Sequence, residues 1–112
     1  MRTMTQMRRA REGPTEEIEQ VARDEGVDPE RVRSGVERGR IVIPLNPLHS
    51  PRPVGIGEGL SVKVNVNIGS SRDLPDMGME VEKARVAERY GAHTVMDLST
   101  GGDIDAIRRA IL

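Results

Sequence analysis

Amide side chains recur at every second position in one stretch of the sequence. Asn65 and Asn67 alternate with valine and isoleucine, and Lys63 precedes them at the same spacing. A side-chain amide offers both a hydrogen-bond donor and an acceptor, which suits a heterocycle or a sugar. Asn67 also stands two residues before Gly69, where the backbone can approach a ligand closely. Asn67 is therefore a candidate substrate-binding residue, although the same alternation is typical of the solvated face of an edge strand.

A second group lies at Met96 and the turn formed by residues 99–102, Ser-Thr-Gly-Gly. The free N–H groups of a following helix would favour a phosphate at this turn, but the same residues are also typical of a tight strand-to-helix connection. Met96 shares a strand face with Thr94 and Leu98, a pattern more typical of a core than of a ligand contact. Asp97 lies on the opposite face, and the pattern leaves open which face points inward.

The histidine and cysteine content excludes several kinds of site. The sequence contains no cysteine, so it offers no thiol nucleophile and no thiolate ligand for an iron–sulfur cluster. His93 and Asp97, four positions apart on one strand, would stand about 13 Å apart at about 3.3 Å per residue, too far to share one metal ion. His49 is alone in a proline-rich segment. We therefore predict no metal site in this chain.

The charge balance limits the class of partner. The chain has 17 basic and 18 acidic residues and a net charge of −1, which excludes a globally basic nucleic-acid binder. No apolar run approaches the roughly 20 residues of a membrane span. We therefore expect a soluble, cytoplasmic protein without a nucleic-acid or membrane partner.

One alternative function is the binding of nucleic acid through a helix-turn-helix. Two predicted helices joined by residues 26–28 have the order of a helix-turn-helix, and four arginines could face phosphates: Arg31, Arg33, Arg38 and Arg40. The first of these helices is strongly acidic, and the second carries no amide or aromatic side chain placed for base reading. A non-catalytic paralogue or binding module built on these helices is the alternative function.

Cap and turn residues divide the chain into short elements. In the N-terminal part we predict three helices, a short strand and a proline-rich loop, over residues 4–11, 15–26, 28–39, 40–43 and 44–53. In the C-terminal part strand and helix alternate, over residues 60–68, 77–90, 94–98 and from Asp103 onward. The order β-α-β-α with short connections is typical of a parallel sheet.

These elements predict an α/β fold in two parts, with a helical region over residues 1–57 and βα units over residues 58–112. Two parallel strands do not complete a sheet or a barrel, which needs eight βα units and about 250 residues. Tyr90 is the only aromatic residue, and Leu112 lies within an amphipathic helix. We therefore expect a truncated architecture, and an isolated chain that folds poorly or aggregates.

Several longer blocks carry a resemblance to a known family. They are residues 38–44, 62–71 (Val-Lys-Val-Asn-Val-Asn-Ile-Gly-Ser-Ser), 81–83, 90–92 and 94–101 (Thr-Val-Met-Asp-Leu-Ser-Thr-Gly). In these blocks, and in family order along nearly the whole chain, the sequence resembles phosphomethylpyrimidine synthase. This family comprises thiamine-pathway enzymes of the radical S-adenosylmethionine type. In residues 46–53 the chain is more proline-dense than the family, and Ser70 replaces a common asparagine, which leaves the role of that loop open.

The resemblance implies a (βα)8 barrel preceded by a small N-terminal region. It implies a carbon–carbon lyase that converts aminoimidazole ribotide to hydroxymethylpyrimidine phosphate, as a homodimer, with a [4Fe–4S] cluster, S-adenosylmethionine and a divalent metal, zinc. Asn67 and Met96 match substrate-binding positions, Met96 through its side chain or its main-chain amide. The catalytic residues, cluster cysteines and metal histidines of the family belong to later sequence. The chain is thus expected to be an N-terminal fragment that is inactive alone.

Overall fold

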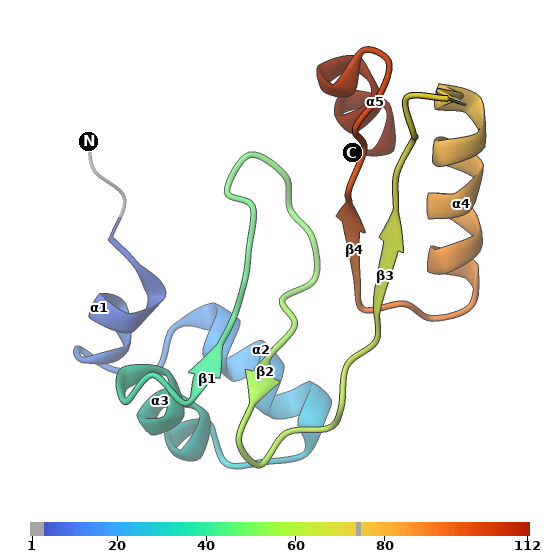
Figure 1. Ribbon diagram of the computed structural model, residues 1–112. Coiled ribbons are helices and arrows are strands. Elements are labelled where there is room, and N and C mark those ends of the chain that lie inside the picture. The colour runs from blue at the N-terminus through green and yellow to red at the C-terminus, as the bar shows by residue number, and fades with distance from the viewer. Residues whose placement is uncertain (1–3, 74) are drawn as a thin grey trace. The chain divides into compact units, whose positions relative to one another are not determined.

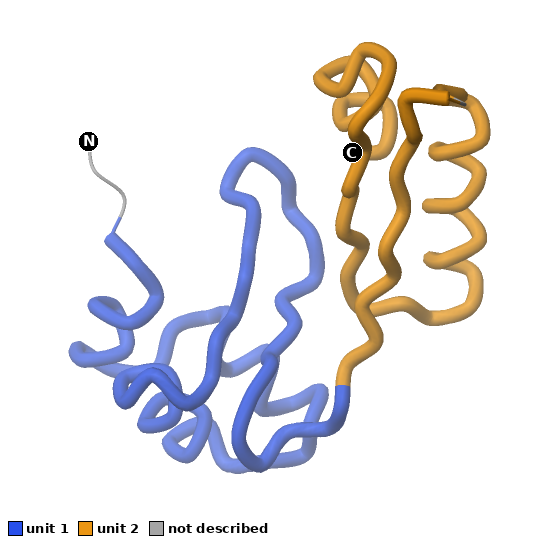
Figure 2. The backbone as a smooth tube through the Cα atoms, viewed as in Figure 1, with its two compact units in different colours: residues 1–62 blue, residues 63–112 orange. Residues whose placement is uncertain are grey.

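Residues 4–73 and 75–112 are described by a computed structural model, in which the chain divides into two units, residues 1–62 and residues 63–112 (Figure 2). The first unit contains α1 (Gln6–Ala10), α2 (Glu16–Glu25), α3 (Pro29–Glu37), β1 (Ile41–Val42) and β2 (Ile56–Gly57). The second contains β3 (Asn65–Ile68), α4 (Met77–Arg89), β4 (Thr94–Asp97) and α5 (Ile104–Ile111) (Figure 1).

In the first unit, α2 and α3 begin at the cap residues that the sequence indicated, whereas α1 is shorter than the predicted range 4–11 and α3 ends at Glu37, before the predicted stop at Gly39. Thr15 caps α2, and its hydroxyl oxygen accepts the Ile18 N–H, while Gly26 ends the helix in a left-handed conformation. Asp28 caps α3, with Pro29 in its first turn. The apolar faces of these helices and of β1 form one buried cluster, Ala10, Ile18, Val21, Ala22, Val32, Val36, Ile41 and Ile43.

In the first unit, β1 and β2 form a short antiparallel pair. Ile41 pairs with Gly57 and Val42 with Ile56, so the proline-rich loop runs between β1 and β2. The strand at β1 was predicted, but β2 was not, because two residues ending in glycine carry no alternation to detect. A side chain at Gly57 would collide with the carbonyl oxygen of Arg40. Glycine therefore permits this close pairing.

The second unit has the predicted β-α-β-α order, and β3 and β4 pair in parallel. The expected strand from Leu60 is shorter than predicted, because the ladder begins only where Asn65 meets Thr94. Within the described residues, residues 61–64 have no paired strand beside them, so their alternation is not used in a sheet. Asp76 and Asp103 cap α4 and α5.

The described residues form two separate two-stranded sheets, one antiparallel and one parallel, and no closed barrel. The fold is therefore mixed α/β. The parallel sheet of the second unit lies beside α4, as Figure 1 shows. Ile68, at the end of β3, is 5% exposed and is one of the few buried apolar residues of this unit.

Candidate functional site

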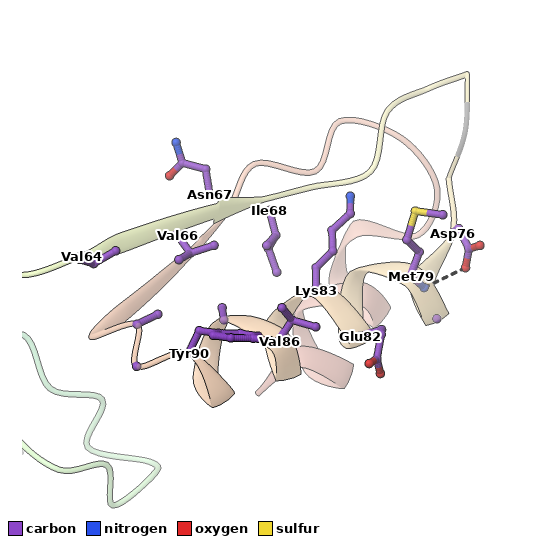
Figure 3. A pocket seen from close by; sticks show the side chains of 14 residues that line it. Val64, Val66, Asn67, Ile68, Asp76, Met79, Glu82, Lys83, Val86 and Tyr90 are labelled. Atoms are coloured by element: carbon purple, nitrogen blue, oxygen red, sulfur yellow. Dashed lines mark hydrogen bonds between the residues drawn. The ribbon is translucent and has the colours of Figure 1, made fainter.

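The two predicted substrate-binding residues lie side by side. In the parallel ladder Asn67 is paired with Met96, and the preceding pair on the same face is Asn65 with Thr94. The side chain of Asn67 projects from β3 on the side opposite to Ile68 and α4 (Figure 3). Because paired residues of a parallel ladder share a face, Met96 also lies on the side away from α4. This assigns the face of Met96 that the sequence pattern left open.

A chain of hydrogen bonds along this face orients the Asn67 amide. Thr94 Oγ1 donates to Asn65 Oδ1 at 2.8 Å, and Asn65 Nδ2 donates to Asn67 Oδ1 at 2.9 Å. Since Asn67 Oδ1 faces Asn65, its Nδ2 amino group is turned away from Asn65 as a donor for a ligand. Met96 is 48% exposed beside it. The face therefore combines a directed amide donor with an apolar thioether.

The loops that follow the two strands are bound tightly to each other. Ser70 N donates to Ser99 Oγ at 3.1 Å, Ser70 Oγ donates to the Gly101 carbonyl at 2.7 Å, and Thr100 N donates to the Ser70 carbonyl at 2.8 Å. Ser70 and Ser99 are both buried. A side chain at Gly101 would come within 2.6 Å of the Arg72 Cα atom. These contacts fix the carboxyl ends of β3 and β4 next to the Asn67–Met96 pair.

The turn at residues 99–102 is a strand-to-helix connection held by the protein itself. The Ser99 N–H donates to Asp97 Oδ1 at 3.0 Å, the Thr100 N–H is bound to Ser70, and Asp103 caps α5 by accepting the Ala106 N–H. These N–H groups are thus engaged within the fold. Of the two interpretations of the sequence, the tight connection agrees with these bonds.

Asp97 is an anionic structural residue. Hydrogen bonding from the Ser99 hydroxyl, together with the Ser99 N–H and the Arg108 guanidinium, outweighs the effect of burial and lowers the pKa of Asp97. Its Oδ2 lies 3.3 Å from Arg108 Nε. His93 has a structural partner as well, because its Nδ1 accepts the Val64 N–H at 2.9 Å. Both side chains thus have hydrogen-bond partners within the second unit.

Across residues 4–73 and 75–112 no group of three or more His, Asp or Glu side chains could hold a metal ion. The sequence has no cysteine. The same described residues include no helix with the length and apolarity that a membrane span requires.

In the structure, some of the arginines on which the helix-turn-helix alternative depends form ion pairs within the protein. Arg33 forms ion pairs with Glu30 and Glu37 and donates to the Ala10 carbonyl. Arg40 pairs with Glu58 at 3.0 Å. Two of the four arginines that would face phosphates are therefore already bound to carboxylates.

Sequence reasoning missed Glu80, which lies in the first turn of α4 and is 2% exposed. Its carboxylate accepts the Gly69 N–H at the end of β3. It also missed an apolar groove of about 940 Å³ between β3 and α4, lined by residues that include Val64, Val66, Ile68, Met79, Val86 and Tyr90 (Figure 3). A glutamate in a first turn is ordinary, so no signal in the sequence set Glu80 apart.

Comparison with known proteins agrees with the family resemblance seen in the sequence. Residues 5–112 match the family model described as the radical SAM ThiC family. The chain is 63% identical over 112 residues to a phosphomethylpyrimidine synthase of Thermus thermophilus and 54% identical over 110 residues to phosphomethylpyrimidine synthase 1 of Methanosarcina mazei. It is 52% identical over 111 residues to the phosphomethylpyrimidine synthase of Thermococcus kodakarensis.

Each of these matches covers 97% of this chain but 26% of the relative. The chain thus spans about a quarter of the length of the curated relatives. The family model covers nearly all of the residues, including both strands that carry Asn67 and Met96. The chain belongs to the radical SAM ThiC family.

Proposed function

We propose that this chain supplies part of the substrate site of a phosphomethylpyrimidine synthase, which converts aminoimidazole ribotide to hydroxymethylpyrimidine phosphate in thiamine biosynthesis. The observation that carries the proposal is the pairing of Asn67 with Met96 on the face of the parallel sheet away from α4. In this proposal Asn67 hydrogen-bonds the ribotide, and Met96 contacts it through its side chain or its main-chain amide.

Supporting the proposal, the Nδ2 group of Asn67 is directed by Asn65, so its orientation is set before a ligand arrives. Preorganised polar groups lose less entropy on binding than mobile ones. The neighbouring thioether offers a polarisable apolar surface to a planar heterocycle. We further propose that β3 and β4 are the first two strands of a (βα)8 barrel, with residues 58–112 as its beginning.

The radical chemistry belongs to other parts of the longer protein in this proposal. A [4Fe–4S] cluster and S-adenosylmethionine would supply the radical, and a divalent metal such as zinc would be held by histidines. Cluster ligation requires thiolates, and this chain has no cysteine. The residues of this chain therefore do not fit the cluster, and in residues 4–73 and 75–112 no group of His, Asp and Glu side chains fits a metal. The part of this chain in the proposal is to bind and orient the substrate. The proposal also includes a homodimeric, cytoplasmic enzyme.

A chimera tests the proposal. Residues 1–112 replace the matching segment of the Thermus thermophilus enzyme, to which they are 63% identical. We expect the chimera to support growth of a strain that lacks phosphomethylpyrimidine synthase without added hydroxymethylpyrimidine. Purified chimera should bind aminoimidazole ribotide in calorimetry, and Asn67→Ala should weaken that binding by about 1–3 kcal/mol, because the ribotide group that Asn67 bonds would be left without a partner in the complex.

Gln20→Ala provides the control, because it removes an amide of similar chemistry from α2, in the other unit. This variant should bind the ribotide like the parent chimera. Unchanged affinity in Asn67→Ala would reject the assigned role of Asn67. Failure of the chimera to support growth, with the Thermus thermophilus enzyme active in the same strain, would count against the function proposed for this chain.

A further inference from the structure

Glu80 is a buried carboxylate that binds the end of the strand carrying Asn67. It is 2% exposed, and its Oε2 accepts the Gly69 N–H at 2.7 Å. Lys83, one turn later on α4, donates from Nζ to Glu80 Oε1 at 2.8 Å. Hydrogen bonds to an ionised carboxylate are about twice as strong as those between neutral groups. The two partners compensate for removing the charge from water.

The Gly69 N–H is held at a point where the backbone has little freedom. Gly69 follows β3 directly, and a side chain there would approach the carbonyl carbon of Leu98 to 2.7 Å. The Leu98 N–H donates to the Ile68 carbonyl at 2.7 Å, on the other side of the same peptide segment. The end of β3 is thus fixed from two directions, by β4 and by the Glu80 carboxylate on α4.

We propose that Glu80 is a positioning residue for Asn67. By holding the Gly69 N–H it fixes the backbone two residues after Asn67, and so sets the angle at which the amide leaves the strand. Asn67 projects away from α4, whereas Lys83, the partner of Glu80, reaches toward β3 from the helix side (Figure 3). Glu80 therefore acts through the backbone and does not touch the ligand. This inference rests on the proposed role of Asn67 in binding the ribotide.

Substitution of a residue that only stabilised α4 would affect the ribotide affinity differently from substitution of a positioning residue. Glu80 lies in the first turn of that helix, where a negative charge is favourable, so its removal also lowers stability. Loss of stability reduces the amount of folded enzyme but leaves the ribotide affinity of the folded fraction unchanged. A positioning role changes that affinity, and only while Asn67 is present to use the position.

The experiment is a double-mutant cycle in the chimera that contains residues 1–112, with aminoimidazole ribotide as the probe and calorimetry as the readout. Glu80→Ala should weaken binding about tenfold, the lower end of the roughly 10- to 100-fold losses that follow removal of the hydrogen-bond partners that orient metal-ligating side chains. In the Asn67→Ala background the same change should have no further effect. Glu80→Gln should restore affinity to within about twofold, because the amide oxygen still accepts the Gly69 N–H.

Glu88→Ala is the matched control, because it removes an exposed glutamate from the same helix. It should leave affinity unchanged in both backgrounds. If Glu80→Ala binds the ribotide like the parent, or weakens binding equally with and without Asn67, the positioning role is overturned. If Asn67→Ala itself binds like the parent, the proposed function of Asn67 fails instead, so the two failures are distinguishable.

Discussion

At the scale of single residues, Glu17 has a strongly lowered pKa. Burial alone would raise its pKa, but hydrogen bonds from its own N–H, Arg9, Gln6 and Thr15 outweigh burial and lower the pKa to about 2. The Arg9 guanidinium binds both carboxylate oxygens, at 3.1 and 3.2 Å. Since the folded pKa is below the ordinary value of 4.5, this carboxylate stabilises the fold above pH 4.5, and that contribution is lost as the pH falls toward 2.

Carbon-detected NMR titration of the Glu17 carboxyl in the 112-residue chain checks this prediction. Glu17 should titrate near pH 2 in the wild type and return toward 4.5 in Arg9→Ala. A Glu17 carboxyl that titrates near 4.5 in the wild type would contradict the ion pair.

The site residues differ in how far the sequence could predict them. Asn67 and Met96 were proposed as substrate-binding residues from specific blocks of sequence, and their pairing follows once two strands are parallel and in register. The alternation in β4 separates Met96 from Asp97 but does not show which of the two faces lies toward α4, so the sequence pattern did not determine the face of Met96. Glu80 could not be predicted, because its importance arises from the tertiary contact with Gly69 and not from its local sequence.

On the scale of the elements, Gly57 decides whether β1 and β2 pair. Gly57 has φ 148°, and a Cβ atom there would lie 2.8 Å from Ile41 Cα. Gly13 has nearly the same φ, 145°, but a Cβ atom there would have nothing within 4 Å. Gly57→Ala should lower the free energy of unfolding by about 1–3 kcal/mol more than Gly13→Ala, because the added contact is with rigid backbone.

Urea unfolding of the 112-residue chain, followed by the NMR signals of α2 amides, measures the two variants. Gly13→Ala carries the cost of the unfavourable dihedral angle alone, so the difference between the variants isolates the steric collision. Equal losses in the two variants would show that the approach of Gly57 to β1 does not stabilise the first unit.

The element boundaries predicted from the sequence agree with the structure where a cap or a proline sets them, and differ from it where strand pairing sets them. Thr15, Gly26 and Asp28 act locally, so both ends of α2 and the start of α3 were predictable. β2 and the shortened β3 depend on where a partner strand lies. Gly35 is another residue whose role depends on a distant contact. A glycine lowers the stability of α3, but it allows Ile41 to pack against the helix. A Cβ atom at position 35 would lie 2.8 Å from Ile41 Cγ1.

At the scale of the whole chain, the two units differ in how much apolar surface they bury. The first has a single cluster of eight buried apolar residues. In the described part of the second, the buried apolar residues are Ile68, Ala87 and Ile107. Large apolar side chains remain exposed there, among them Val64, Met77, Met79, Val86, Tyr90, Val95, Met96 and Leu98. A two-stranded sheet with so little buried surface is marginal in water.

This difference predicts unequal protection from amide hydrogen exchange in the isolated 112-residue chain. Amides of α2 should be protected about a hundredfold more than those of β3 and β4, because local opening costs least where few apolar contacts are broken. In the chimera with the Thermus thermophilus enzyme, β3 and β4 should gain protection while α2 changes little, since added chain would cover the apolar groove beside β3. Equal protection of both units in the isolated chain would mean that the second unit is stable without further contacts. In that case the apolar groove between β3 and α4 would need an explanation other than burial within a longer protein.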